Sequence, residues 1–99
     1  MLDPAVAEAA RDLVPGAEVF VLTWLDRADR DVLAVHPRDD PANPVTGVFS
    51  TRSQDRPNPV GLHRVTVAAI DGLRLRVQGL EAFDGTPVVD LKPVLEGGR

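Results

Sequence analysis

The sequence predicts a mainly β fold: a small antiparallel β-barrel, complete or incomplete, with one short helix at the N-terminus. Short runs of β-branched and aromatic residues alternate with turn residues such as Pro-Gly and Asp-Gly. Helical spacing of apolar residues occurs in a single stretch near the N-terminus. The 99 residues suffice for one domain, and a sheet of that size must curl, close or cover its edges to avoid aggregation.

The helix is expected directly after Asp3 and Pro4. An aspartate suits the N-cap, and a proline suits the first helical position because its missing N–H has no helical partner there. Spacings of three and four residues place Ala5, Val6, Ala9, Ala10 and Leu13 on one face. Pro15-Gly16 ends the helix.

The first strand is expected over residues 18–25, an apolar run typical of a strand that is buried on both faces. Such a strand does not suit an edge of the sheet and needs a partner on each side, one of which the sequence does not reveal. Shorter strands are expected over residues 32–36 and 47–50, separated by a proline-rich loop.

A hairpin is the clearest element of the C-terminal half. It joins residues 62–70 to 73–80 through the two-residue turn Asp71-Gly72, a dipeptide that suits the right-handed twist of paired strands. Apolar and polar residues alternate in its second strand, which predicts one buried and one solvated face. A last strand is expected over residues 85–91.

Composition narrows the class of protein. Without cysteine, the chain has neither disulfides nor thiolate metal sites, and no apolar run approaches the ~20 residues of a membrane span. The N-terminus has no basic leader, so we expect a soluble cytoplasmic protein. A net charge of −4 argues against indiscriminate coating of nucleic acid. The preference for arginine over lysine reflects either a GC-rich genome or a need for forked donors.

One loop carries the strongest sign of a binding site. Pro57 and Pro59 stiffen the backbone that presents four polar side chains, those of Arg52, Ser53, Arg56 and Asn58. Donors fixed on a stiff frame are what a binding site requires. An equally good interpretation of the spacing is that these arginines merely pair with Asp55 and nearby acidic residues.

A second candidate is the turn at Asp84-Gly85, where backbone amides around Gly85 and Thr86 are free to meet a ligand. For a lone Asp-Gly, a simple turn is the more ordinary interpretation. His36 and His63 lack metal-ligand spacing, so we expect ordinary strand histidines and no metal site. We expect the two aromatic side chains at positions 20 and 24 to lie in the core.

Two strings, Gly47-Val-Phe-Ser-Thr-Arg-Ser…Arg-Pro-Asn-Pro-Val-Gly-Leu62 and Asp84-Gly-Thr-Pro-Val-Val-Asp-Leu-Lys-Pro93, closely resemble the TsaA/TrmO-like family in the family's order. Members are S-adenosylmethionine-dependent tRNA methyltransferases that act on threonylcarbamoyladenosine beside the anticodon. The resemblance covers nearly the whole chain. It implies a single β-barrel domain over residues 1–99, a homodimer and a tRNA partner.

The resemblance also implies the roles of individual residues. The residues expected to bind S-adenosylmethionine are Asp26, Arg27, Arg52, Leu62, Asp84, Gly85, Thr86 and Pro87. Asp26 departs from the family, in which many members carry a histidine. Arg56, Asn58 and Lys92 are expected to hold the tRNA backbone or the threonyl carboxylate. No catalytic residue is assigned, since Asp26, Asp84 and Asp90 all remain open as proton acceptors.

The N-terminus departs from the family more strongly. Members usually begin with a strand and a Pro-Arg-Gln loop that touches the methyl donor, and we expect this chain to lack both. The sequence therefore leaves two functions open. One is a tRNA methyltransferase, and the other is a non-catalytic or truncated β-domain that binds RNA or a protein partner.

Overall fold

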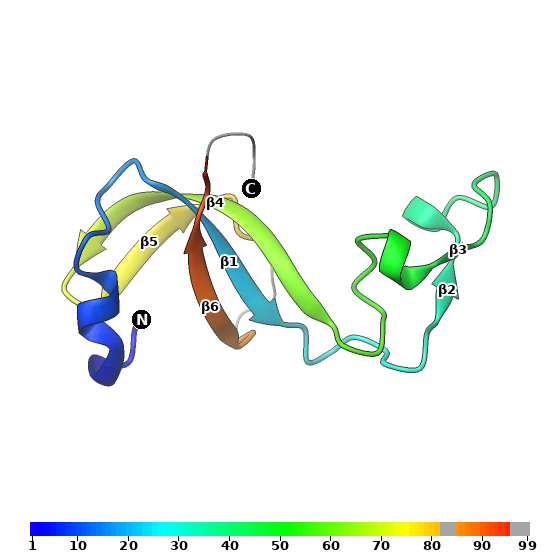
Figure 1. Ribbon diagram of the computed structural model, residues 1–99, viewed down its shortest axis with the longest axis horizontal. Coiled ribbons are helices and arrows are strands. Elements are labelled where there is room, and N and C mark those ends of the chain that lie inside the picture. Colours follow the sequence, from blue (N-terminus) through cyan, green and yellow to red (C-terminus); the bar gives the residue numbers. More distant parts are fainter. Residues whose placement is uncertain (82–84, 96–99) are drawn as a thin grey trace.

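The computed structural model describes residues 1–81 and 85–95. Its centre is a four-stranded antiparallel sheet in the order β5-β4-β1-β6 (Figure 1). The four strands are β1 (Glu18–Trp24), β4 (Val60–Asp71), β5 (Arg74–Gln78) and β6 (Val88–Pro93). The predicted mainly β, antiparallel class is confirmed. Within the described residues the two edge strands do not pair with each other, so the sheet stays open instead of closing into a barrel.

Strand β1 occupies a central position, as its apolar sequence predicts. It pairs with β4 along its whole length, from Glu18 opposite Thr66 to Trp24 opposite Val60, and with β6 on its other side. The expectation that one of its neighbours would be missing is therefore wrong. The second neighbour is β6, whose strand begins three residues later than the sequence predicts.

The core lies on one face of the sheet. Four valines from β1 and β4 form it, with Val19 directly opposite Val65. Phe20 and Trp24 lie half-buried on the other face, not in the core as predicted. The Arg30 guanidinium stands 5.3 Å from the centre of the Trp24 ring. Alternation along an extended strand explains the difference, because every second side chain of β1 points away from the core.

The predicted hairpin is present with its turn shifted by one residue. Asp71 pairs with Arg74, so Gly72 and Leu73 form the two-residue turn. Gly72 adopts a φ of +57°, a conformation that favours glycine. A β-bulge lies between Val67 and Ala69.

The N-terminal helix is a 3₁₀-helix, η1 (Pro4–Ala10), capped by Asp3, whose carboxylate accepts a hydrogen bond of 2.8 Å from the Ala5 amide. The predicted start is confirmed, whereas the predicted apolar face is not buried as a unit. With three residues per turn, positions spaced by three and four do not stay on one face. Only Ala10 and Leu13 of that face are half-buried, and Leu13 packs on the core.

An arm, residues 26–58, projects from the sheet (Figure 1). It carries the two-residue strands β2 (Ala34–Val35) and β3 (Thr46–Gly47) and the 3₁₀ turns η2 (Pro37–Asp39) and η3 (Val48–Ser50). These strands are shorter than predicted, and most of the expected third strand is η3. The arm raises the radius of gyration to 15.6 Å, against about 13 Å for a globular domain of this size.

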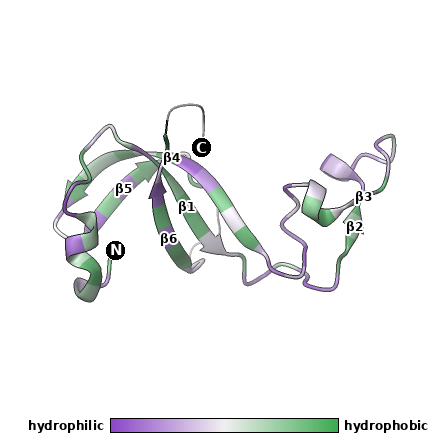
Figure 2. Cartoon of the chain, in the orientation of Figure 1, coloured by the Kyte–Doolittle hydropathy of each residue, from purple (hydrophilic) through white to green (hydrophobic). Residues whose placement is uncertain are grey.

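Polar contacts hold the two legs of the arm together. The Asp29 amide donates to the Asp55 carboxylate over 2.9 Å, and the Arg30 side chain donates to the Pro57 carbonyl over 2.8 Å. In Figure 2 the legs are largely hydrophilic, whereas the strands of the sheet are largely hydrophobic. The legs therefore depend on specific hydrogen bonds more than on a hydrophobic core of their own.

Candidate functional site

A depression of about 230 Å³ lies at the base of the arm. It is lined by Leu25, Arg52, Ser53, Gln54, Arg56, Val60, Gly61, Leu62, His63 and Glu81. These residues come from the end of β1, the returning leg of the arm, the start of β4 and the segment after β5. Segments that are distant in sequence thus meet here only once the sheet has formed.

The two arginines of this pocket have different roles. Arg56 is half-buried, and its Nη1 donates to the carbonyls of Thr51 at 3.0 Å and Ser53 at 3.2 Å. Arg52 is exposed and makes no hydrogen bond or ion pair within residues 1–81 and 85–95. Arg56 therefore braces the loop, and Arg52 is available to a ligand. Neither arginine pairs with Asp55, the alternative that the sequence left open.

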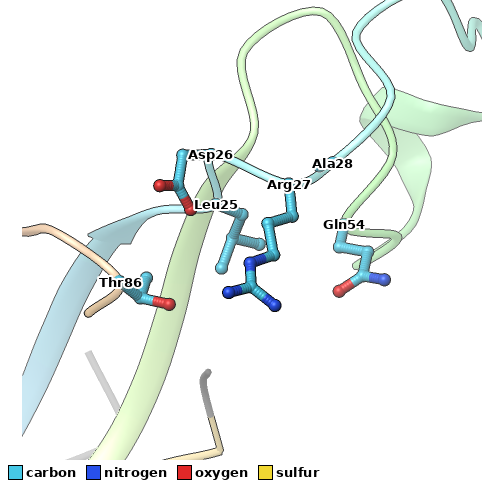
Figure 3. Close-up of a pocket in the computed structure, with 6 residues that line it drawn as sticks. All are labelled: Leu25, Asp26, Arg27, Ala28, Gln54 and Thr86. Carbon is cyan, nitrogen blue, oxygen red and sulfur yellow. The ribbon is translucent and has the colours of Figure 1, made fainter. Parts of the chain in front are cut away.

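A smaller depression of about 40 Å³ adjoins the first one and shares Leu25 and Gln54 with it. Its remaining walls are Asp26, Arg27, Ala28 and Thr86 (Figure 3). This volume suits one or a few water molecules or a small part of a ligand. Because the two depressions share two lining residues, they lie side by side at the base of the arm.

The structure brings together most of the predicted donor-binding residues. Arg52 and Leu62 line the larger depression, and Asp26, Arg27 and Thr86 line the smaller one. Of the other predicted donor-binding residues, Gly85 and Pro87 line neither, although the Pro87 carbonyl accepts a hydrogen bond from the Trp24 amide at 2.9 Å. Asp84 lies outside the described residues.

The predicted substrate-binding residues do not form one group. Arg56 lines the larger depression with its guanidinium engaged in the loop. Asn58 is exposed at the base of the arm, and Lys92 is exposed on β6 opposite Phe20. Neither Asn58 nor Lys92 lines either of these two depressions.

Sequence reasoning missed four pocket side chains: Leu25, Gln54, His63 and Glu81. Leu25, Gln54 and His63 each stand next to a residue that was singled out, so proximity to the motifs was the available signal. Glu81 follows β5 and carries no such signal. Its place in the pocket depends on how the chain leaves the hairpin.

His63 is tied to the centre of the sheet. Its Nε2 lies 2.9 Å from the hydroxyl of Thr23, whose residue is only 1% exposed. Thr23 pairs across the strands with Gly61. A Cβ at Gly61 would lie 2.3 Å from the Thr23 Oγ1 and 2.7 Å from the His63 Nε2, so this position has no room for a side chain.

Within the part of the chain that the structure describes, no helix has the length and apolarity needed to span a bilayer. The same residues contain no group of three or more His, Cys, Asp or Glu side chains that could hold a metal ion. The two adjoining depressions at the base of the arm form the candidate site.

Comparison with known proteins shows the family of this chain. The model of the tRNA-methyltransferase O N-terminal domain matches residues 1–97. A probable S-adenosyl-L-methionine-binding protein of Archaeoglobus fulgidus is 48% identical, over 91% of this chain and 24% of its own length. A relative with the same description from Methanothermobacter thermautotrophicus is 47% identical, over 94% of this chain and 66% of its own length.

Solved structures agree with the sequence relatives. The crystal structure of TrmO from Pseudomonas aeruginosa matches with a TM-score of 0.71 and 30% identity, over 95% of this chain and 39% of that chain. The chain thus spans between about a quarter and two thirds of the length of these relatives. The resemblance noted in the sequence is confirmed: the chain belongs to the tRNA-methyltransferase O N-terminal domain family.

Proposed function

We propose that the two depressions at the base of the arm bind S-adenosylmethionine, and that the protein methylates threonylcarbamoyladenosine beside the anticodon of tRNA. The observation that carries this proposal is the convergence of Asp26, Arg27, Arg52, Leu62 and Thr86 on two adjoining depressions. Curated relatives described as S-adenosyl-L-methionine-binding proteins support the choice of ligand.

The side chains of the site fit such a ligand. The free guanidinium of Arg52 suits a carboxylate, the exposed Asp26 carboxylate suits ribose hydroxyls, and Leu25 offers apolar surface. The larger depression is slightly below the ~300–1,000 Å³ of typical ligand sites, so a ligand of this size would extend into the smaller one. A second copy of the chain in a homodimer would then cover the ligand's open side.

S-adenosylmethionine, when bound, supplies a methyl group on a positively charged sulfur. The residues of this chain would align the acceptor nitrogen with that methyl group and exclude water, the two effects from which an in-line displacement gains most. Asp26 is a proton acceptor within the site, whereas the Asp90 carboxylate accepts a hydrogen bond of 2.8 Å from the Leu91 amide and lies outside it.

The tRNA partner would meet exposed hydrogen-bond donors outside the two depressions. Lys92 and Asn58 are exposed and available to phosphates, while Arg56 supports the loop from within. With a net charge of −4, binding would depend on these local donors and not on a general positive field. With tRNA as its substrate, the protein would act in the cytoplasm.

The test is a methyl-transfer assay with labelled S-adenosylmethionine and tRNA that carries threonylcarbamoyladenosine. We expect transfer to this tRNA and none to the same transcript without the modification. Arg52→Ala should weaken donor binding about tenfold or more, and Arg76→Ala, an exposed arginine on β5, should leave it unchanged. Donor binding without transfer would indicate the non-catalytic alternative. Absence of donor binding would refute the proposal.

A further inference from the structure

The structure assigns a role to His63 that its sequence context does not suggest. Resting on the proposed function, we infer that Thr23 and Gly61 position His63 so that its Nδ1–H donates a hydrogen bond to an oxygen atom of the ligand in the larger depression. His63 would thereby determine which ligand is accepted, and Thr23 would be a positioning residue.

The first step concerns the hydrogen of the Thr23 hydroxyl. Thr23 is 1% exposed, and His63 Nε2 at 2.9 Å is its only side-chain hydrogen-bond partner within the described residues. A buried hydroxyl without a partner is costly, so its hydrogen points to this nitrogen. Nε2 then accepts, and the neutral imidazole carries its hydrogen on Nδ1.

The second step concerns the backbone below this pair. Gly61 lies opposite Thr23 in the β1–β4 register, and His63 follows two residues later on the same face. Because a Cβ at position 61 would approach both the hydroxyl and the ring within 3 Å, only glycine lets the two side chains meet. Gly61 is buried, so the absence of a side chain there makes room for the contact between Thr23 and His63.

The third step concerns what faces His63. His63 lines the larger depression together with Arg52 and Glu81, and its Nδ1 has no hydrogen-bond partner in residues 1–81 and 85–95. A ring N–H that lines the same depression as a free guanidinium suits an oxygen acceptor, above all a carboxylate. Both the methionyl part of the donor and the threonylcarbamoyl group of the nucleoside carry such an oxygen.

The test compares variants in two separate calorimetric titrations, one with S-adenosylhomocysteine and one with the nucleoside N6-threonylcarbamoyladenosine. Thr23→Val keeps the shape of the side chain and removes the hydroxyl. His63→Gln places its amide nitrogen near the former Nε2, and His63→Asn places it near Nδ1. We expect Thr23→Val and His63→Gln to weaken binding of at least one probe about tenfold, and that probe identifies the source of the oxygen.

Rescue separates this role from a merely structural one. Thr23→Ser restores the hydroxyl and should recover most of the affinity, and His63→Asn should bind more tightly than His63→Gln. The matched controls are Thr66→Val on β4 and His36→Gln in the arm, both outside the depressions, which should bind as the unchanged protein does. Thermal unfolding of each variant verifies that it is folded.

Two results overturn the inference, and they differ. If the unchanged protein binds a probe and both Thr23→Val and His63→Gln bind it equally well, the role of His63 is wrong while the proposed function stands. If the unchanged protein binds neither probe, the proposed function fails and the inference fails with it.

Discussion

Replacing Gly61 with alanine tests the packing beneath the site. The new Cβ would lie 2.3 Å from the Thr23 Oγ1 and 2.7 Å from the His63 Nε2, and 3.3 Å from the Leu25 Cδ2. Overpacking of this kind costs about 1–3 kcal/mol, and loss of the Thr23–His63 hydrogen bond adds about 1 kcal/mol. The free energy of unfolding should therefore fall by about 2–4 kcal/mol.

Thermal unfolding followed by circular dichroism measures this change. At roughly 4–8 °C per kcal/mol for a domain of this size, the Tm should fall by about 10 °C or more. Gly47→Ala is the matched control, because a Cβ at Gly47 meets nothing within 4 Å. Its effect should stay within about 0.5 kcal/mol of zero, or slightly stabilise the fold.

A double substitution isolates the cause. Thr23→Ala removes the oxygen that the new Cβ would meet first, so Gly61→Ala should cost less in that background than alone. A Gly61→Ala protein that unfolds at the same temperature as the unchanged protein would refute the reasoning, and strictly additive effects would show that the steric contact is not the cause.

Three further predictions follow from the same structure. Val67 is 0% exposed, so Val67→Ala should lower the free energy of unfolding by about 2 kcal/mol, measured by urea denaturation. A loss below about 0.5 kcal/mol would contradict the place of Val67 in the core. Glu18→Gln removes an ion pair with Arg64, and both side chains of this pair are half exposed. The variant should therefore lower the free energy of unfolding by less than about 1 kcal/mol, and high salt should abolish this difference from the unchanged protein. Arg56→Ala releases two loop carbonyls and should weaken donor binding in calorimetry, whereas unchanged affinity would show that the loop needs no brace.

Regular patterns in the sequence predicted the regular parts of the fold. The apolar run of β1 indicated a central strand, and the alternation after Gly72 indicated a hairpin with one solvated face; both are present. Local patterns fix such elements because the side chains of neighbouring residues decide which face is buried. The side of the sheet on which Phe20 lies was not predictable, since a continuous apolar run does not show which face is covered.

The candidate site was predictable only in part. The motifs indicated Arg52 and Thr86, which are 34 positions apart in sequence and now line adjoining depressions. They could not show that Arg56 is engaged by carbonyls of its own loop, because that contact depends on the loop's path. Nor could they reveal the contact between Thr23 and His63, which requires the register of β1 against β4.

The central claim is that the base of the arm is the donor site, and NMR titration of ¹⁵N-labelled protein with S-adenosylmethionine tests it most directly. We predict that amide shifts change along residues 25–28, 52–56 and 60–63 and at Thr86, while those of η1 and β5 stay in place. A spectrum that does not respond, or changes concentrated on η1 and β5, would contradict the account.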